Sequence, residues 1–247
     1  MRPTCLIFIL VLVATALSVA PAVSQGWTGP YAGVHSGYRL GTLDISNAGY
    51  PFPGAGGGTG ATPARTETFL ARGAIAGTHF GFNIALAGPW LIGVETDVSL
   101  GEGHDRRRSP FAATYFTPQN EAFITTLQDR TARFTTTWQG STRLRMGIAL
   151  GPLLFYVTAR TAYQRAKWTE TSSVTGGTTD SVGKSMTLVG WAAGSGIEAF
   201  VAPNFILRTE YLYEDFGTVS VPLAFSNETA KADITVQKIR AGLSFKF

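Results

Sequence analysis

The C-terminal stretch from Ile234 to Phe247, ITVQKIRAGLSFKF, alternates apolar and polar residues up to the last position of the chain. The apolar set is Ile239, Ala241, Leu243, Phe245 and Phe247, and the polar set between them is Lys238, Arg240, Gly242, Ser244 and Lys246. A period of two indicates a β-strand with one face of each kind. The arginine and lysine face is too polar for an ordinary core. The stretch therefore predicts a strand whose apolar face meets lipid and whose polar face lines the inside of a barrel.

The N-terminus contains the one long apolar run of the chain. It combines a positive residue, an apolar segment and a small-residue cleavage site, namely Arg2, Leu6 to Leu17 and Ala20-Pro21-Ala22. This pattern predicts a secretory signal peptide over residues 1–22, cleaved near Ala22 to Gln25, followed by one domain over residues 23–247. An uncleaved anchor helix is the less favoured alternative, because the run is short and breaks at Pro21.

The composition fits a secreted β-protein. A mean hydropathy of +0.12 over 247 residues is too low for a bundle of membrane helices. The single cysteine, Cys5, lies inside the predicted signal peptide, so the mature chain has no cysteine and needs rigidity from a source other than disulfides. A closed barrel supplies it, since every strand is paired on both sides.

Seven further stretches show the same alternation as the C-terminus. They lie near 31–41, 70–84, 90–101, 135–149, 153–168, 190–200 and 205–216. The connections alternate between long polar stretches, predicted as loops over 42–68, 102–134, 169–184 and 217–232, and tight Gly/Pro turns at 87–89, 150–152 and 202–204. The expected fold is all-β: an eight-stranded antiparallel up-and-down transmembrane β-barrel with long extracellular loops and short periplasmic turns.

Aromatic residues gather near the two ends of the predicted strands. One set is Trp90, Phe155, Phe205 and Phe245, and the other is Tyr38, Trp138, Tyr163 and Trp191. Two such belts are expected at the two interfaces of a membrane. A soluble β-sandwich remains an alternative; in that case the charged faces would be exposed to solvent and the apolar faces would form the core.

The inward faces of the predicted strands carry both charges. We expect a cross-strand ion-pair network inside the barrel, because an arginine fork can satisfy two carboxylates at once. Its predicted members are Arg39, Glu95, Asp97, Arg143, Arg145, Arg160, Glu198, Arg208, Glu210 and Arg240, with Glu214 and Lys238 on the same faces. The interior of an eight-stranded barrel is just wide enough for side chains to fill it. The network is therefore interpreted as a polar core that plugs the barrel, with a narrow ion path along the same residues as the alternative.

Nothing in the sequence predicts catalysis, a cofactor or a metal. The histidines are His35, His79 and His104. His35 and His79 fall on inward faces, where two histidines without a third ligand are more typical of satisfied interior groups than of a metal site. His104 precedes the basic run Arg106-Arg107-Arg108, which is either a solvated loop or a contact to phosphates of the outer leaflet. The net charge of +4 is spread over strands and loops, which argues against a nucleic-acid partner.

The ordered set of strand motifs resembles the porin-like outer-membrane β-barrel family of alphaproteobacteria, which are small surface antigens. The matching stretches are WTGPYAGVHSGY at 27–38, GAIAGTHFGFN at 73–83, LIGVETDVSLG at 91–101, TRLRMGIAL at 142–150, LLFYVTARTAY at 153–163, GWAAGSGIEAF at 190–200, FILRTEYLYEDFG at 205–217 and the terminal IRAGLSFKF. One departure is Ala159-Arg160, where the family often has a pair of glycines, so any pore would be tighter here.

This resemblance implies a protein of the Gram-negative outer membrane with a structural, surface-antigen or limited pore role and no particular substrate. The alternating Leu243, Phe245 and Phe247 resemble the C-terminal signal that outer-membrane barrels present to their assembly machinery. The expected partners are therefore outer-membrane lipid, lipopolysaccharide and that machinery, and the barrel is expected to be a monomer. A channel for small ions and a secreted or periplasmic soluble β-protein that binds an apolar ligand remain the alternative functions.

Overall fold

The computed structural model of the chain describes residues 25–47, 50–53, 59–62, 64–117, 122–174, 179–224 and 228–247. The predicted signal peptide, residues 1–22, lies outside these residues. The described residues contain no helix that is both long enough and apolar enough to cross a membrane.

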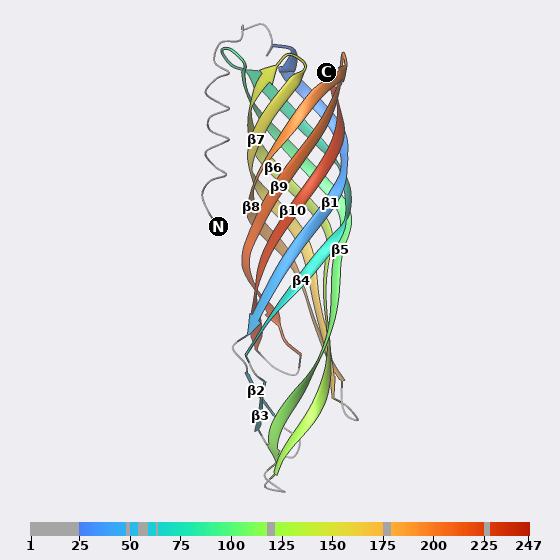
Figure 1. Cartoon of the computed structure of the whole chain (residues 1–247), viewed down its shortest axis with the longest axis vertical. Coiled ribbons are helices and arrows are strands. Elements are labelled where there is room, and N and C mark those ends of the chain that lie inside the picture. The colour runs from blue at the N-terminus through green and yellow to red at the C-terminus, as the bar shows by residue number, and fades with distance from the viewer. Residues whose placement is uncertain are drawn as a thin grey trace.

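A short 3₁₀ helix and ten strands make up the described chain (Figure 1). Their bounds are η1 Gln25–Trp27, β1 Gly29–Asn47, β2 Tyr50–Pro53, β3 Thr59–Thr62, β4 Arg65–Ala85, β5 Trp90–Thr117, β6 Ala122–Leu150, β7 Leu153–Val174, β8 Thr179–Ala202, β9 Phe205–Pro222 and β10 Thr229–Lys246.

Eight of these strands close into a ring. Its order is β1-β4-β5-β6-β7-β8-β9-β10, and each strand is antiparallel to both neighbours. β10 returns to β1, with a register that runs from Tyr31↔Lys246 to Ser46↔Lys231. β2 and β3 form a separate hairpin that pairs with the outer part of β5. The predicted eight-stranded up-and-down barrel is thus confirmed.

The two ends of the barrel differ, as Figure 1 shows. At one end, which we call the short-turn end, tight turns join β4 to β5, β6 to β7 and β8 to β9. At the other, which we call the long-hairpin end, β5 and β6 continue for 28 and 29 residues in all. About ten tilted residues suffice to cross a bilayer, so these strands extend far past that length.

In the half of the barrel nearer the short turns, apolar side chains face out and charged side chains face in. Exposed outward residues include Val34, Tyr38, Phe80, Val94, Val98, Leu144, Val157, Trp191, Leu207 and Ile239. The charged side chains that the sequence places on the opposite faces are buried inside the ring. This arrangement is the reverse of a β-sandwich, so the sandwich alternative is wrong.

The four long loops predicted from the sequence are mostly strand, which corrects that prediction. The range 102–134 belongs to β5 and β6 except for residues 118–121, and 169–184 and 217–232 are likewise largely β7 to β10. Within 42–68, β1 continues to Asn47, β2 and β3 pair with each other, and β4 begins at Arg65.

The reason for the error is that the apolar face changes sides along each strand. In β10, Ile234 and Val236 point inward and are about 2% exposed or less, whereas Ile239 points outward and is 61% exposed. The outward positions beside the first two are Asp233 and Gln237. From Gln237 of β10 toward the long-hairpin end, the outside of the ring is polar and the inside is apolar. The alternation persists, but its polarity is inverted, because the surroundings of the ring change from hydrocarbon to water.

Two apolar clusters occupy the interior on either side of the charged layer. The cluster at the long-hairpin end, here the outer core, includes Leu43, Phe69, Phe134, Trp168, Leu188, Phe216 and Ile234. The cluster at the short-turn end, here the inner core, includes Trp27, Leu91, Leu154, Tyr156 and Ile206, with Phe200 packed against it. Trp27 is supplied by η1, so residues before the first strand close over this end of the barrel.

Candidate functional site

The charged side chains inside the ring lie opposite one another because the strand register places them so. Glu95 of β5 faces Arg143 of β6, and Glu210 of β9 faces Arg240 of β10. Opposite charges at directly paired positions of neighbouring strands attract. The alternation of the sequence thus sets the face of each charge, and the register places three acids opposite bases, the third being Glu198 opposite Arg208. Arg143 also faces Arg160, and Arg39 faces Lys238, so the remaining contacts come from across the ring.

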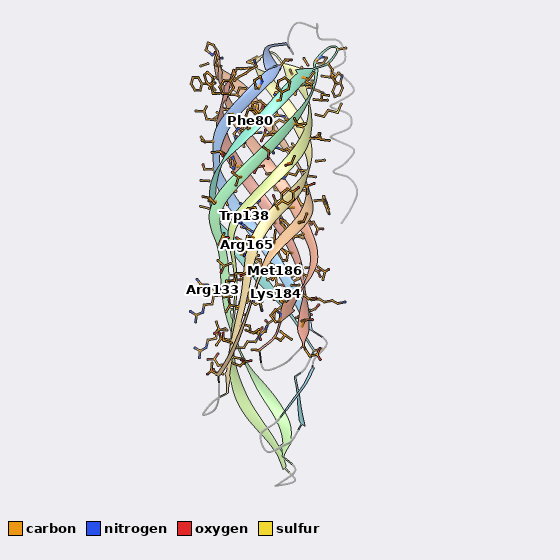
Figure 2. All side chains as sticks on the ribbon, turned by 180° about the vertical axis from the view of Figure 1, so that it is seen from behind. Phe80, Arg133, Trp138, Arg165, Lys184 and Met186 are labelled. Carbon is orange, nitrogen blue, oxygen red and sulfur yellow. The ribbon has the colours of Figure 1, made fainter. Side chains whose placement is uncertain are left out.

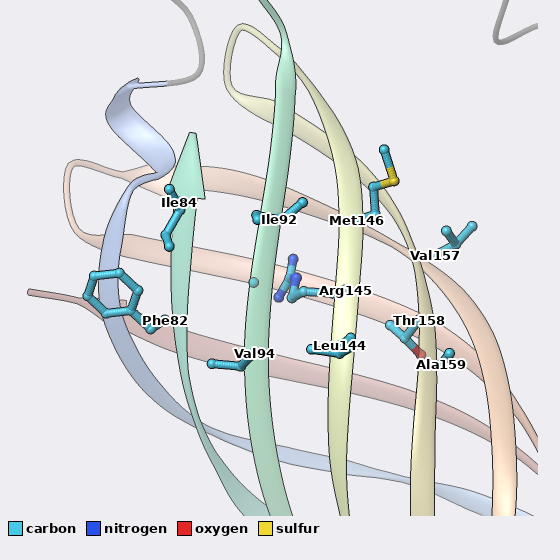
Figure 3. Close-up of a pocket in the computed structure, with 11 residues that line it drawn as sticks. Phe82, Ile84, Ile92, Val94, Leu144, Arg145, Met146, Val157, Thr158 and Ala159 are labelled. Atoms are coloured by element: carbon cyan, nitrogen blue, oxygen red, sulfur yellow. The ribbon is translucent and has the colours of Figure 1, made fainter. Parts of the chain in front are cut away.

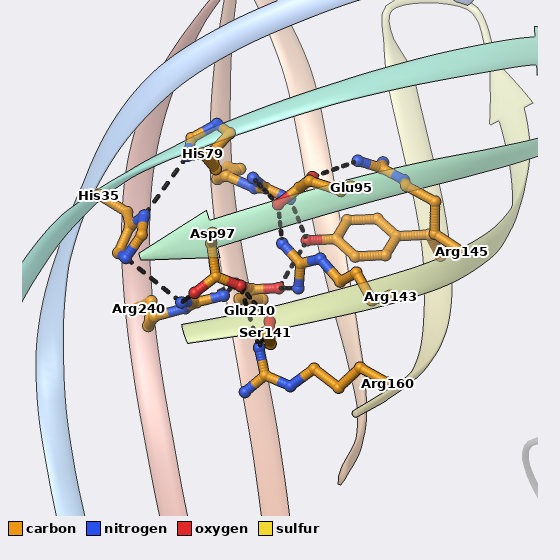
Figure 4. Close-up of polar contacts among 12 residues, drawn as sticks. His35, His79, Glu95, Asp97, Ser141, Arg143, Arg145, Arg160, Glu210 and Arg240 are labelled. Carbon is orange, nitrogen blue, oxygen red and sulfur yellow. Dashed lines mark hydrogen bonds and ion pairs between the residues drawn. The ribbon is translucent and has the colours of Figure 1, made fainter. Parts of the chain in front are cut away.

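Glu95 is the centre of the network (Figure 4). Its carboxylate accepts from Arg143 and from both terminal nitrogens of Arg208, at 3.0 and 2.9 Å. Arg145 reaches the same carboxylate at 3.3 Å, and the hydroxyl of Tyr31 donates to it at 2.6 Å. The side chain of Glu95 has no exposed area. A buried carboxylate needs this many donors, because burying an unpaired charge is very costly.

The network continues from Glu95 through the barrel. Arg143 also donates to Glu210 at 2.6 Å, and Glu210 accepts from Arg240 Nε at 2.7 Å. Arg240 in turn donates to Asp97 at 2.9 Å. One connected system therefore runs through the barrel, and its bond from Arg240 to Asp97 joins residues 143 positions apart in the sequence.

Both ends of this system add further members. At one end, Arg145 donates to Glu198 at 2.9 and 2.8 Å, and Arg208 lies 3.3 Å from the same carboxylate. At the other end, Arg160 joins Asp97 to Glu214, and Lys238 donates to Glu214 at 2.7 Å.

Arg39 stands apart from the other predicted members. It is 1% exposed inside the ring, but it donates to neutral oxygens, those of Thr136 at 2.5 Å and Gln164 at 2.9 Å. The remaining predicted residues, together with Glu214 and Lys238, form the connected system described above. That system contains five carboxylates and six cations, so its formal charges balance to within one.

Two tyrosines belong to the site although the sequence did not single them out. Arg145 stacks against Tyr156, with its guanidinium carbon 4.1 Å from the ring centroid, and lies 5.6 Å from the ring of Tyr31. Both tyrosines occupy inward positions of their strands, next to glycines of the neighbouring strand. A Cβ at Gly81 would collide with Tyr31, and one at Gly196 would collide with Tyr156. The sequence contains a signal for these two residues, because each is an aromatic residue on the charged face of a strand and lies opposite a glycine.

Replacing Gly196 with valine is therefore expected to lower the free energy of unfolding by about 2 kcal/mol, since it overpacks a full interior. Urea unfolding of the refolded protein in detergent, followed by tryptophan fluorescence, measures this. Gly183→Val is the matched control, because the nearest atom to a Cβ there is 3.5 Å away. Equal losses for the two variants would show that Tyr156 is free to move.

A second ion cluster lies toward the long-hairpin end. Arg130 donates to Glu67 and to Glu170, both at 2.8 Å, and all three side chains are largely buried. The sequence pattern does not predict this cluster, because Arg130 and Glu67 fall in the ranges 102–134 and 42–68, which are predicted as loops.

The two inward histidines, His35 and His79, are neighbours. Their Nδ1 atoms are 3.4 Å apart, His35 Nε2 lies 2.8 Å from Ser99 Oγ, and His79 Nε2 lies 2.7 Å from Ser244 Oγ. Within the described part of the chain, no three His, Cys, Asp or Glu side chains are grouped so that they could hold a metal ion.

The basic run after His104 lies in strand β5 and not in a loop. Arg108 makes a two-pronged ion pair with Asp129 of β6 on the exposed surface. This hydrogen bonding lowers the pKa of the Asp129 carboxyl.

A surface groove of about 460 Å³ crosses β4 to β7 near the short-turn end (Figure 3). Its walls are outward apolar side chains: Phe82, Ile84, Ile92, Val94, Leu144, Met146, Val157 and Ala159. Arg145 also borders it, but the Arg145 side chain is fully buried and its charge is engaged inside the ring. The groove offers only hydrocarbon contacts, which suits acyl chains better than a polar ligand.

Comparison with known proteins agrees with this architecture. The family described as outer membrane protein β-barrel domain matches residues 9–247. The 31 kDa outer-membrane immunogenic protein of Brucella melitensis biotype 1 is 27% identical over 237 residues, which are 94% of this chain and 89% of that protein. The 25 kDa outer-membrane immunogenic protein of Brucella abortus biovar 1 is 34% identical over 110 residues, which cover 44% of this chain and 46% of that protein.

Among solved structures, the crystal structure of neisserial surface protein A has a TM-score of 0.38 and 13% sequence identity. The match covers 89% of this chain and 98% of that chain.

Proposed function

The chain belongs to the outer membrane protein β-barrel domain family, and on this premise we propose that it is a structural, surface-exposed barrel whose interior is plugged by its own side chains. It is a protein of the Gram-negative outer membrane. Short turns of such barrels lie in the periplasm, so the short-turn end is periplasmic and the long-hairpin end is extracellular. This location sets aside the soluble, ligand-binding alternative.

The observation that supports a plug is the succession of layers along the barrel axis. The inner core, with Trp27, lies at the periplasmic end. The charge network follows, with Arg143 and Glu95 having no exposed side-chain area. The outer core then fills the extracellular half of the ring. An ion crossing this barrel would need to pass two apolar layers, where an unpaired charge is very costly.

Planar bilayers test the plug directly. Wild-type protein, shown to be folded by its heat-modifiable gel mobility, is expected to insert and give no steady conductance, because apolar side chains close both ends of the charged layer. Steady conductance that disappears when Arg143 and Arg160 are replaced by alanine would contradict the plug and support the narrow-channel alternative.

A surface role follows from the extracellular extensions and from the names of the relatives. The similar Brucella proteins are called immunogenic outer-membrane proteins. In this chain, the hairpin of β5 and β6 projects farthest from the barrel (Figure 1). We infer that this ribbon is the main contact surface that the protein offers outside the cell.

The proposed role is not catalytic. The histidine and serine pairs of the interior, His35 with Ser99 and His79 with Ser244, are all about 5% exposed or less. Catalysis would need a histidine near a nucleophile or a carboxylate at a rim that a substrate can reach. These pairs are better explained as hydrogen-bonded parts of the polar layer.

For assembly, we propose that the outward face of β10 is presented to the barrel assembly machinery. Phe247, Phe245 and Leu243 are 65%, 41% and 42% exposed at the periplasmic end of the last strand. Phe245 lies edge-to-face with Phe247, at 5.3 Å between ring centroids. Their accessibility fits a segment that a partner binds before the strand enters the membrane. We also propose that the finished barrel is a monomer, since the pairing of β10 with β1 closes the ring.

A further inference from the structure

Four cations form a continuous patch on the outer wall of the barrel, on β5, β6 and β7. They are Arg106, Arg133, Arg165 and Lys167, and all four are exposed. Figure 2 shows Arg133 and Arg165 on the extracellular side of Trp138. We call these four residues the cationic patch.

The strand register brings the patch together. Arg106 of β5 lies directly opposite Arg133 of β6. Lys167 of β7 pairs with Thr135 and Arg133 pairs with Thr169, so Lys167 is the diagonal neighbour of Arg133. Arg165 is the next outward position on β7. Long side chains at direct and diagonal positions are within reach of one another, so one small anion can contact several of them.

The patch lacks an acidic partner among the described residues. Like charges directly opposite each other, such as Arg106 and Arg133, destabilise a sheet unless something neutralises them. Asp129 is already paired with Arg108, and Asp105, the residue before Arg106, lies 3.9 Å from Arg107. Inward-facing Glu170 is bound to Arg130. An anion from outside the chain would remove this repulsion.

The opposite wall of the barrel is mainly acidic at its outward positions, with Lys231 as an exposed cation among them. Asp44 of β1 faces Asp233 of β10, and Asp215 lies outward on neighbouring β9. A basic rim that served only for solubility would be spread around the ring. Exposed cations also stand singly on other strands, namely Arg72, Lys184 and Lys231, but only β5 to β7 bring four of them together, and this grouping indicates a localised partner.

The depth of the patch identifies the partner. Arg165 lies two positions from Tyr163 along β7, and Trp138 lies at the bulge of β6 opposite this segment. Tyr163 and Trp138 are outward, each 37% exposed, and belong to the extracellular aromatic belt, which marks the headgroup level of a membrane. Arginine forks at that level match the oxygen geometry of phosphate.

We propose that Arg106, Arg133, Arg165 and Lys167 bind the phosphorylated headgroup of a glycolipid in the outer leaflet. This inference rests on the outer-membrane location of the chain and is independent of whether the interior conducts ions. It goes beyond the proposed function, because it assigns one lipid-binding wall to a barrel that otherwise meets lipid on all sides.

The test uses the folded, delipidated full-length barrel in neutral detergent and diphosphorylated lipid A as the probe, with Kd measured by titration. The variant R133Q/R165Q/K167Q is expected to weaken binding about a hundredfold, at about fivefold for each of the three charges lost at a membrane surface. K231Q is the matched control, since Lys231 is an exposed cation of β10 on the acidic wall. It is expected to leave Kd within about twofold, because surface charges beyond a Debye length are screened.

Further arms make the result decisive. Lipid A stripped of its phosphates is expected to bind the wild type as weakly as the triple variant binds the intact lipid. The charge-conserving R133K/R165K variant is expected to bind more weakly than the wild type and more tightly than the triple variant, because lysine keeps the charge but not the two-pronged geometry. Should the triple variant fail to fold, the lipid stripped of phosphates tests the proposal on the wild type alone. Unchanged affinity of the triple variant for diphosphorylated lipid A would overturn the proposal. So would a crosslinked dimer of wild-type chains that the same substitutions abolish, since the acidic wall of a second copy would then be the partner.

Discussion

Replacing Glu95 with glutamine is expected to lower the free energy of unfolding by about 4 kcal/mol, because it leaves buried cations without enough carboxylates. Glu95 accepts from Arg143, Arg145 and Arg208, and after the change these three share only Glu198 and Glu210 with the rest of the network. The quantity to measure is the free energy of unfolding in urea, with the protein refolded in detergent.

Two further variants test whether the loss of stability comes from buried cations that are left without a carboxylate. Asp44→Asn removes an exposed carboxylate that accepts only from Thr68 in the described chain, and it is expected to cost less than about 0.5 kcal/mol. The double variant E95Q/R143M removes one orphaned cation as well, so it should recover at least about 1 kcal/mol relative to E95Q. If E95Q unfolds at the same urea concentration as the wild type, the network is not a source of stability.

Removing the aromatic ring at the last position is expected to have a large effect of another kind. Phe247→Ala should strip most of the protein from the outer membrane of growing cells, because we propose that assembly depends on the exposed apolar face that ends at Phe247. The same change should cost less than about 1.5 kcal/mol in the refolded protein, the range of a single ring-to-ring contact. The measurements are the amount of heat-modifiable barrel in isolated outer membranes and the unfolding curve of the purified chain.

Val201→Ala is the control for that experiment. Val201 is 58% exposed at the periplasmic end of β8, so its loss removes a similar apolar contact outside the C-terminal pattern. Normal outer-membrane levels of Phe247→Ala would refute the role proposed for the last strand. A matching loss of stability in detergent would instead assign the effect to folding.

The sequence alone predicted which residues line the barrel but not which of them touch. A period of two fixes the face of every residue in a strand, so Glu95, Arg143 and Glu210 could be assigned to the interior. The bond from Arg240 to Asp97 joins β10 to β5, which are not neighbours in the ring. Such contacts depend on barrel closure and on the tilt of the strands, and neither is encoded in a local pattern.

The extracellular half was predicted poorly for a related reason. Leu43 points inward at 1% exposure, and Asp44 beside it points outward, which is the normal pattern of a strand in water. The strand bounds were predicted from an outward face that stays apolar, so each predicted strand ends where the outward face becomes polar. The inversion of polarity marks a change of solvent from hydrocarbon to water, and it indicates both the longer strands and the outer core.

The length of β5 and β6 also sets how far above the membrane an approaching particle first meets the protein. The stretch of β5 from Leu100 to Thr117 follows the extracellular aromatic level and spans about 55 Å of backbone at the usual rise per residue. An antibody or another large particle therefore meets the ribbon well before it reaches the lipid headgroups. Sequence change at that tip can alter what the particle recognises without disturbing the buried ion pairs that hold the barrel together.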